Sequence, residues 1–191
     1  MYHTAFGVYG ILVRQNCLAV IKKKAGPYQN RYDLPGGSME AGELLEDTLC
    51  REFKEETGMT VTSYHQLGTI NFLYPWHYQG MSMNNHICVF YEIKATTGNL
   101  EKNVSQFAGQ DSLGAAFFPI EQLNEENSSP LVLKACEVFK QDTFTAKSQR
   151  LKKWILASFS LGEGTKKKPS PDLWEMTFCP FFQAGSMING S

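Results

Sequence analysis

The 191-residue chain lacks any long apolar run, and no stretch approaches the roughly 18 consecutive residues that a membrane-spanning helix needs. Its first residues contain neither a basic leader nor a small-residue cleavage site, so no secretion signal is expected. From these two absences we expect a protein of the cytoplasm that does not bind membranes.

An excess of charge of one sign is also lacking. Lys and Arg number 18 and Asp and Glu number 19, which gives a net charge of -1. A chain without excess positive charge has no general attraction to nucleic acid, so no nucleic-acid partner is expected. The five cysteines are odd in number and widely spaced without a CxxC pair, so neither a zinc site nor a disulfide framework is indicated.

The composition that remains is typical of a globular domain, with 42% hydrophobic and 13% aromatic residues. The length fits one domain of ordinary size with a small appendage. We place the domain at residues 1–142 and a C-terminal extension of unknown role at residues 143–191. Within the extension we predict a basic amphipathic helix over 147–159, then a linker and an apolar tail. The tail is a candidate contact with a second subunit, so a homodimer is one assembly to consider.

Hydrophobic periodicity predicts an α/β protein of mixed layers. The strands are expected at residues 4–13, 17–23, 31–34, 69–74, 86–95 and 115–120, and the helices at 44–57, 120–126 and 130–141. Between two of these strands, residues 75–85 are expected to form an aromatic loop that is long enough to bind a ligand.

Three glutamates crowd into five residues at the end of the first predicted helix: Glu52, Glu55 and Glu56. Residues three and four apart share a helix face, so these side chains point the same way. Each like-charge pair at that spacing costs roughly 0.2–0.5 kcal/mol, and the negative end of the helix dipole adds a few tenths more. A divalent cation would reverse the sign of these terms, and all-oxygen ligands select hard ions such as Mg²⁺ or Mn²⁺. A solvated acidic helix face is the alternative.

Two adjacent glycines, Gly36 and Gly37, precede this helix. A backbone without side chains allows a ligand or a metal to approach closely, and a Gly-Gly loop leading into a helix is suited to phosphate contacts. For the glycine pair alone, a plain turn is the alternative.

Together, these residues resemble the signature of the Nudix hydrolases. That signature reads glycine, five residues, glutamate, seven residues, Arg-Glu, an apolar residue, any residue, Glu-Glu, any residue, glycine and an apolar residue. Every fixed position is filled at the correct spacing, by Gly37, Glu43, Arg51, Glu52, Phe53, Glu55, Glu56, Gly58 and Met59. The resemblance covers roughly residues 1–140. It implies an α/β/α sandwich with a mixed β-sheet, and hydrolysis of a diphosphate linkage in a nucleoside diphosphate derivative.

The resemblance also implies roles for individual residues. The three glutamates and Gly36 are expected to hold Mg²⁺ or Mn²⁺, with the glutamates and Arg51 forming the catalytic set and Arg51 orienting the carboxylates. An additional general base is expected from outside the helix, with Asp111 as the first candidate and Glu101 as the second. Surface acids with no role in catalysis are the alternative for both.

For substrate binding we predict Arg31, Gly37, Tyr74 and Trp76. An arginine fork suits phosphate oxygens, and aromatic rings stack on a base. An exposed structural arginine and aromatic residues of the core or rim are the alternatives.

The expected partner is a small-molecule nucleotide. A nucleoside triphosphate, ordinary or oxidised, is the first choice because such substrates are frequent in the family. ADP-ribose, a nucleotide sugar and a dinucleoside polyphosphate are the alternatives. A Nudix-like sensor that binds a nucleotide without cleaving it is an alternative of another class. Such a module is expected to lose carboxylates of the signature, and here all are present.

Overall fold

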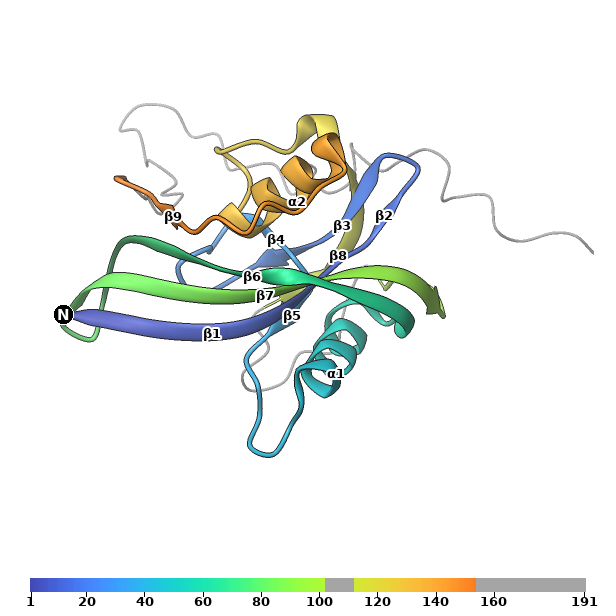
Figure 1. Ribbon diagram of the computed structural model, residues 1–191, viewed down its shortest axis with the longest axis horizontal. Coiled ribbons are helices and arrows are strands. Elements are labelled where there is room, and N and C mark those ends of the chain that lie inside the picture. The colour runs from blue at the N-terminus through green and yellow to red at the C-terminus, as the bar shows by residue number, and fades with distance from the viewer. Residues whose placement is uncertain (102–111, 154–191) are drawn as a thin grey trace, which may run out of the picture.

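The computed structural model describes residues 1–101 and 112–153, which form two sheets and two α-helices (Figure 1). The larger sheet has the strand order β5-β1-β7-β6-β9, with β1 at Tyr2–Ile11, β5 at Gly36–Gly37, β6 at Thr60–Tyr78, β7 at Met81–Thr97 and β9 at Gln149–Arg150. The smaller sheet contains β2 at Val13–Arg14, β3 at Cys17–Lys23, β4 at Tyr32–Asp33 and β8 at Ser112–Pro119. The helices are α1 at Leu45–Thr57 and α2 at Pro130–Gln141, with a short 3-10 helix at Ile120–Gln122.

The two helices lie on opposite sides of the strands (Figure 1). Neighbouring residues of β1 and β7 point to opposite faces, as the period of a strand requires. Val8 and Val89 belong to the buried cluster that contains residues of α1, whereas Tyr9 and Phe90 belong to the cluster that contains residues of α2. The expected α/β/α sandwich with a mixed sheet is therefore confirmed, since β1 runs parallel to β7 and β6 runs antiparallel to it.

Helix α1 follows the predicted pattern closely. Leu49 and Phe53 are fully buried against the sheet. Gly58 ends the helix in the left-handed conformation, with φ of 77°, and its N–H donates to the Lys54 carbonyl at 2.9 Å. Because the apolar stripe faces the sheet, the acidic face of the last turns is directed elsewhere. No helix among the described residues is long and apolar enough to cross a membrane.

The predicted aromatic loop at residues 75–85 is wrong. Strands β6 and β7 continue through this region and pair as far as Tyr78 and Met81, leaving only Gln79 and Gly80 as the turn. Both turn residues have positive φ, 46° and 79°, as a tight two-residue hairpin requires. On the edge of β6 that faces away from β7, the short strand β9 pairs with Phe72 and Leu73. Pro75 lies beyond these two residues, so it can stand in β6 without removing a hydrogen bond to β9.

The helix predicted over residues 147–159 is also wrong in the part that the structure describes. Gln149 and Arg150 form β9, which pairs in parallel with Phe72 and Leu73 of β6. Phe144, just before this strand, packs on the core cluster that contains α2. The start of the extension is therefore held by the sheet edge, where backbone hydrogen bonds replace those of a helix.

The rest of the extension, with its predicted linker and apolar tail, lies outside the described residues, as does Asp111. Among the cysteines, Cys88 and Cys136 are buried free thiols and Cys50 is a half-buried one. Cys17 is buried and disulfide-bonded, which the cysteine spacing did not predict.

Candidate active site

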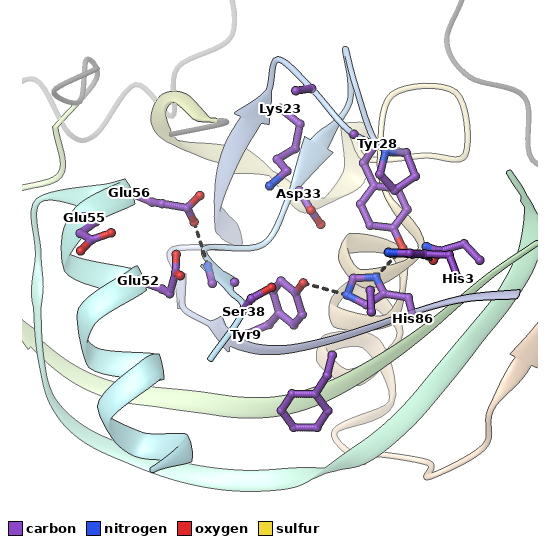
Figure 2. A pocket seen from close by; sticks show the side chains of 18 of the residues that line it. His3, Tyr9, Lys23, Tyr28, Asp33, Ser38, Glu52, Glu55, Glu56 and His86 are labelled. Atoms are coloured by element: carbon purple, nitrogen blue, oxygen red, sulfur yellow. Dashed lines mark hydrogen bonds between the residues drawn. The ribbon is translucent and has the colours of Figure 1, made fainter. Parts of the chain in front are cut away.

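The chain before α1 passes between β1 and the acidic face of that helix (Figure 2). Gly36 pairs with Tyr9 of β1 and donates its N–H to the Glu56 carboxylate at 2.8 Å. Its φ is 142°, and a Cβ atom built on it would lie only 2.2 Å from the Val8 carbonyl oxygen. Glycine is therefore required at this position, both by the backbone conformation and by the close approach of β1.

Gly37 makes a second close approach, to Glu52. A Cβ atom on Gly37 would lie 2.7 Å from the carboxylate atoms of Glu52. The three glutamates differ in exposure, since Glu56 is 3% exposed and the side chains of Glu52 and Glu55 are 17% and 38% exposed. Burial raises the pKa of Glu52, and the hydrogen bond from Arg51 opposes that rise.

Arg51 contacts three carboxylates, one before the start of α1 and two on the helix itself. Its Nε and Nη2 donate to the two oxygens of Glu43 at 2.5 and 2.9 Å, and its Nη1 donates to Glu52 at 2.8 Å. Its Nη1 also lies 3.7 Å from the Glu55 carboxylate. The guanidinium thus contacts the acidic cluster from one edge.

The Glu43–Arg51 pair predicts how the stability of the protein depends on pH. Hydrogen bonds from Arg51 hold the pKa of Glu43 at about 2, below its ordinary value of 4.5. A carboxylate whose pKa is lowered on folding stabilises the protein above its ordinary pKa, and this stabilisation is lost as the pH falls toward the folded value. In metal-free buffer, wild type should therefore exceed Glu43→Gln in melting temperature at pH 6–7, and the difference should shrink between about pH 5 and 2. A constant difference over that range would show that Arg51 does not hold Glu43 ionised.

The donor set of the acidic face fits a hard divalent cation. It consists of carboxylate oxygens beside the two glycines, which line the same cavity, and Mg²⁺ and Mn²⁺ prefer oxygen ligands. In the described part of the chain, no three His, Cys, Asp or Glu side chains already converge as a metal site. Like charges repel, so separated carboxylates are the expected arrangement before a cation draws them together. Glu52, Glu55, Glu56 and the Gly36 backbone are the groups that would hold it.

These carboxylates form one end of a cavity of about 420 Å³, a size typical of small-molecule sites. Figure 2 shows the glutamates on one side of this cavity and His3, Tyr28 and His86 on the other. At this second end the His3 ring packs edge-on against Trp76, with ring centres 5.7 Å apart.

Hydrogen bonds connect the second end of the cavity. The Asn84 amide oxygen accepts from His3 Nδ1 at 2.8 Å, and its amide nitrogen donates to the Tyr74 hydroxyl at 2.5 Å. His86 lies between two tyrosine hydroxyls, with Nε2 at 2.9 Å from Tyr9 and Nδ1 at 2.8 Å from Tyr28. This end therefore combines rings for stacking with polar groups that are held in place.

Asp33 adds a buried carboxylate to the cavity. Its Oδ1 accepts from the Leu34 N–H at 3.0 Å and from the Ser129 hydroxyl at 2.6 Å. Ser129 also caps α2, where its hydroxyl oxygen accepts from the Val132 N–H at 3.2 Å. The start of α2 thus fixes one wall of the cavity.

The structure separates the predicted binding residues. Gly37 and Trp76 line the cavity. Arg31 does not, because it is only 7% exposed and its guanidinium donates to the Glu125 and Ser128 carbonyls, beside a different cavity at α2. Contact between Arg31 and a phosphate at the acidic face is therefore not supported.

Tyr74 is fully buried in the core, with its hydroxyl bonded to Asn84, so it offers no ring face to a base. Glu101, the second candidate for the extra base, does not line the cavity and lies instead against Gly58 at the end of α1.

Several residues of the cavity were not predicted from the sequence, namely His3, Tyr9, Lys23, Tyr28, Asp33, Asn84 and His86. A signal for two of them exists, since Asn84 and His86 are polar residues two apart and so share one face of a strand. His3 pairs with Asn84 across the parallel strands, a neighbour relation that the sequence alone does not give.

A sequence model of the NUDIX domain matches residues 1–136. The chain belongs to the NUDIX family. It is 31% identical over 122 residues to an ADP-ribose pyrophosphatase of Methanocaldococcus jannaschii, a match that covers 63% of this chain and 65% of that protein. It is also 31% identical over 136 residues to an oxidized purine nucleoside triphosphate hydrolase of Mus musculus, covering 67% of this chain and 83% of that protein.

Solved structures of NUDIX proteins share the fold. The crystal structure of a MutT NUDIX hydrolase from Burkholderia pseudomallei superposes with a TM-score of 0.57 at 21% identity, covering 71% of this chain and 97% of that one. The family assignment rests on the sequence match over residues 1–136, and it confirms the resemblance inferred from the stretch between Gly37 and Met59.

Proposed function

We propose that the protein is a divalent-metal-dependent pyrophosphohydrolase that cleaves a diphosphate linkage in a nucleotide. The observation that carries this proposal is the two-ended cavity. Oxygen ligands for a cation lie at one end, and rings and hydrogen-bonding groups suited to a nucleoside lie at the other. A substrate that spans the cavity would place its phosphates at the acidic face of α1 and its base near Trp76.

Each group at the acidic face has a distinct part in the proposed reaction. A bound cation would neutralise the diphosphate and lower the pKa of the attacking water. Glu56 is held by the Gly36 N–H, and Arg51 holds Glu52. Burial raises the pKa of Glu52, which suits a group that accepts a proton from water. These contacts direct Glu52 and Glu56 toward the place where the phosphates of the substrate would lie.

For the substrate we propose a nucleoside triphosphate, ordinary or oxidised. Within the described residues, the cavity has one end lined by aromatic side chains, which matches a substrate with a single nucleoside. The mouse relative is named for oxidised purine nucleoside triphosphates, whereas the archaeal relative is named for ADP-ribose.

The test is the formation of nucleotide products, separated by chromatography, from ordinary and oxidised nucleoside triphosphates, ADP-ribose, nucleotide sugars and a dinucleoside polyphosphate. Each substrate is assayed with Mg²⁺, with Mn²⁺ and with a chelator. We expect metal-dependent hydrolysis with at least a tenfold preference in kcat/KM for triphosphates. A preference for ADP-ribose would overturn the substrate assignment but leave the chemistry intact. Nucleotide binding without hydrolysis of any substrate would overturn the enzyme and favour a sensor.

A further inference from the structure

His86 is buried at the floor of the cavity and has a hydrogen-bond partner at each ring nitrogen. It is 6% exposed, and burial, together with the nearby Lys23 and His3, lowers its pKa to about 3. The imidazole is therefore neutral at physiological pH and carries one N–H and one lone pair.

The two tyrosines that contact His86 are also neutral. A tyrosine hydroxyl ordinarily loses its proton only at about pH 10, so both side chains are protonated at physiological pH. The trio thus has three protons, two on hydroxyls and one on the imidazole, but makes only two hydrogen bonds between its members. When His86 donates to one hydroxyl it accepts from the other, so its tautomer fixes the direction in which each hydroxyl bonds.

Tyr28 directs its hydroxyl to a second partner within the protein, Tyr74. Both tyrosines line the cavity, and Tyr9 lies between the glutamates of α1 and His86 (Figure 2). The bond to His86 determines whether the Tyr9 hydroxyl offers a proton or a lone pair to a ligand there. The Tyr9 ring lies over Gly7, since a Cβ atom on Gly7 would be 2.5 Å from the hydroxyl oxygen.

We propose that His86 is a positioning residue that holds the Tyr9 hydroxyl toward the nucleoside part of the substrate in a single hydrogen-bonding orientation. The inference rests on the proposed function, because it requires that a nucleotide occupies the cavity. Tyr9 makes the contact with substrate, and His86 and Gly7 act through Tyr9. The phosphates would bind at the acidic end of the cavity, which is formed by other groups. Loss of the contact between His86 and Tyr9 should therefore weaken binding of the nucleoside but not of the phosphates.

The experiment is a double-mutant cycle with Tyr9→Phe and His86→Phe in the full chain. Dissociation constants of AMP, GMP and inorganic pyrophosphate are measured by calorimetry with Mg²⁺, beside KM and kcat. Each single substitution should weaken the better-bound monophosphate about tenfold, the loss expected for one hydrogen bond at a buried site, and pyrophosphate less than twofold. The double variant should also lose about tenfold rather than a hundredfold, because both substitutions remove the same contact.

Two further variants guard against a simple folding defect. Gly7→Ala removes no polar group but displaces the Tyr9 hydroxyl, so it should reproduce the selective loss of monophosphate affinity. His86→Gln keeps one donor and one acceptor and should recover part of the affinity that His86→Phe loses. A loss of monophosphate affinity in the double variant that equals the product of the two single losses would overturn the inference. A loss of pyrophosphate affinity as large as that of monophosphate affinity would also overturn it.

Nitrogen NMR of the histidine rings supplies a readout that is independent of ligand and of activity. His86 should be neutral and in one tautomer from pH 5 to 8, and that signal should change in Tyr9→Phe. A charged ring or a mixture of tautomers would contradict the proposed role. If the wild type binds neither nucleotide and hydrolyses none, the proposed function itself fails. An active wild type with an additive cycle refutes the role of His86 alone.

Discussion

Replacing Glu56 by glutamine should lower the rate of metal-dependent hydrolysis about 100- to 1000-fold, the scale seen when one preorganised electrostatic group is removed from an active site. The amide oxygen of glutamine can still accept the Gly36 N–H that Glu56 accepts at 2.8 Å. Substitution also removes one of three like charges from the helix face. The melting temperature in metal-free buffer should therefore be unchanged or higher, while the loss of activity is large.

Matched variants separate the role of Glu56 from general effects of charge. Glu55→Gln should also reduce activity strongly and leave stability unchanged, since this side chain is the most exposed of the three. Glu121→Gln, an exposed acid on the short 3-10 helix, should leave both quantities unaltered. A large loss of stability for Glu56→Gln without metal would indicate that the carboxylate supports the fold instead of holding a cation.

Alanine at the two adjacent glycines should have opposite consequences. Gly36→Ala places a side chain 2.2 Å from the Val8 carbonyl oxygen at φ of 142°, where neither backbone can move freely. We expect a loss of about 2–4 kcal/mol in the free energy of unfolding, which corresponds to a fall in melting temperature of roughly 5–15 °C. Gly37→Ala meets only the end of the flexible Glu52 side chain, so the fold should be retained.

The activity of the folded protein should fall strongly in Gly37→Ala, although this variant keeps its stability. Displacing the Glu52 carboxylate by about 1 Å should lower kcat roughly 100-fold in Gly37→Ala while its melting temperature stays near wild type. Thermal unfolding and kcat, measured on the same preparations, check both expectations. A stable Gly36→Ala or a fully active Gly37→Ala would refute the account of the close approaches of β1 and Glu52 to these glycines.

The acidic end of the site was predictable because its members are near one another in the sequence. Spacing alone places Glu52, Glu55 and Glu56 on one helix face, and Gly58 marks where that helix ends. Local propensity also fixes α2, whose bounds match the predicted helix, because Pro130 and the cap at Ser129 define its start.

The second end of the cavity was not predictable, because long-range pairing assembles it. His3 and Asn84 are 81 residues apart and become neighbours only through the parallel pairing of β1 with β7. Residues 75–85 were predicted as a loop, whereas the pairing of β6 with β7 extends the two strands through most of this segment. Arg31 was assigned to phosphate on its chemistry alone, and packing instead directs it to backbone carbonyls near α2.

Binding of Mn²⁺ to the wild type and to Glu56→Gln, measured by electron paramagnetic resonance in the absence of nucleotide, tests the central claim most directly. If the acidic face of α1 holds the catalytic cation, the wild type should bind Mn²⁺ and Glu56→Gln should bind it at least tenfold more weakly. Equal binding by the two proteins would contradict the assignment of this face as the metal site.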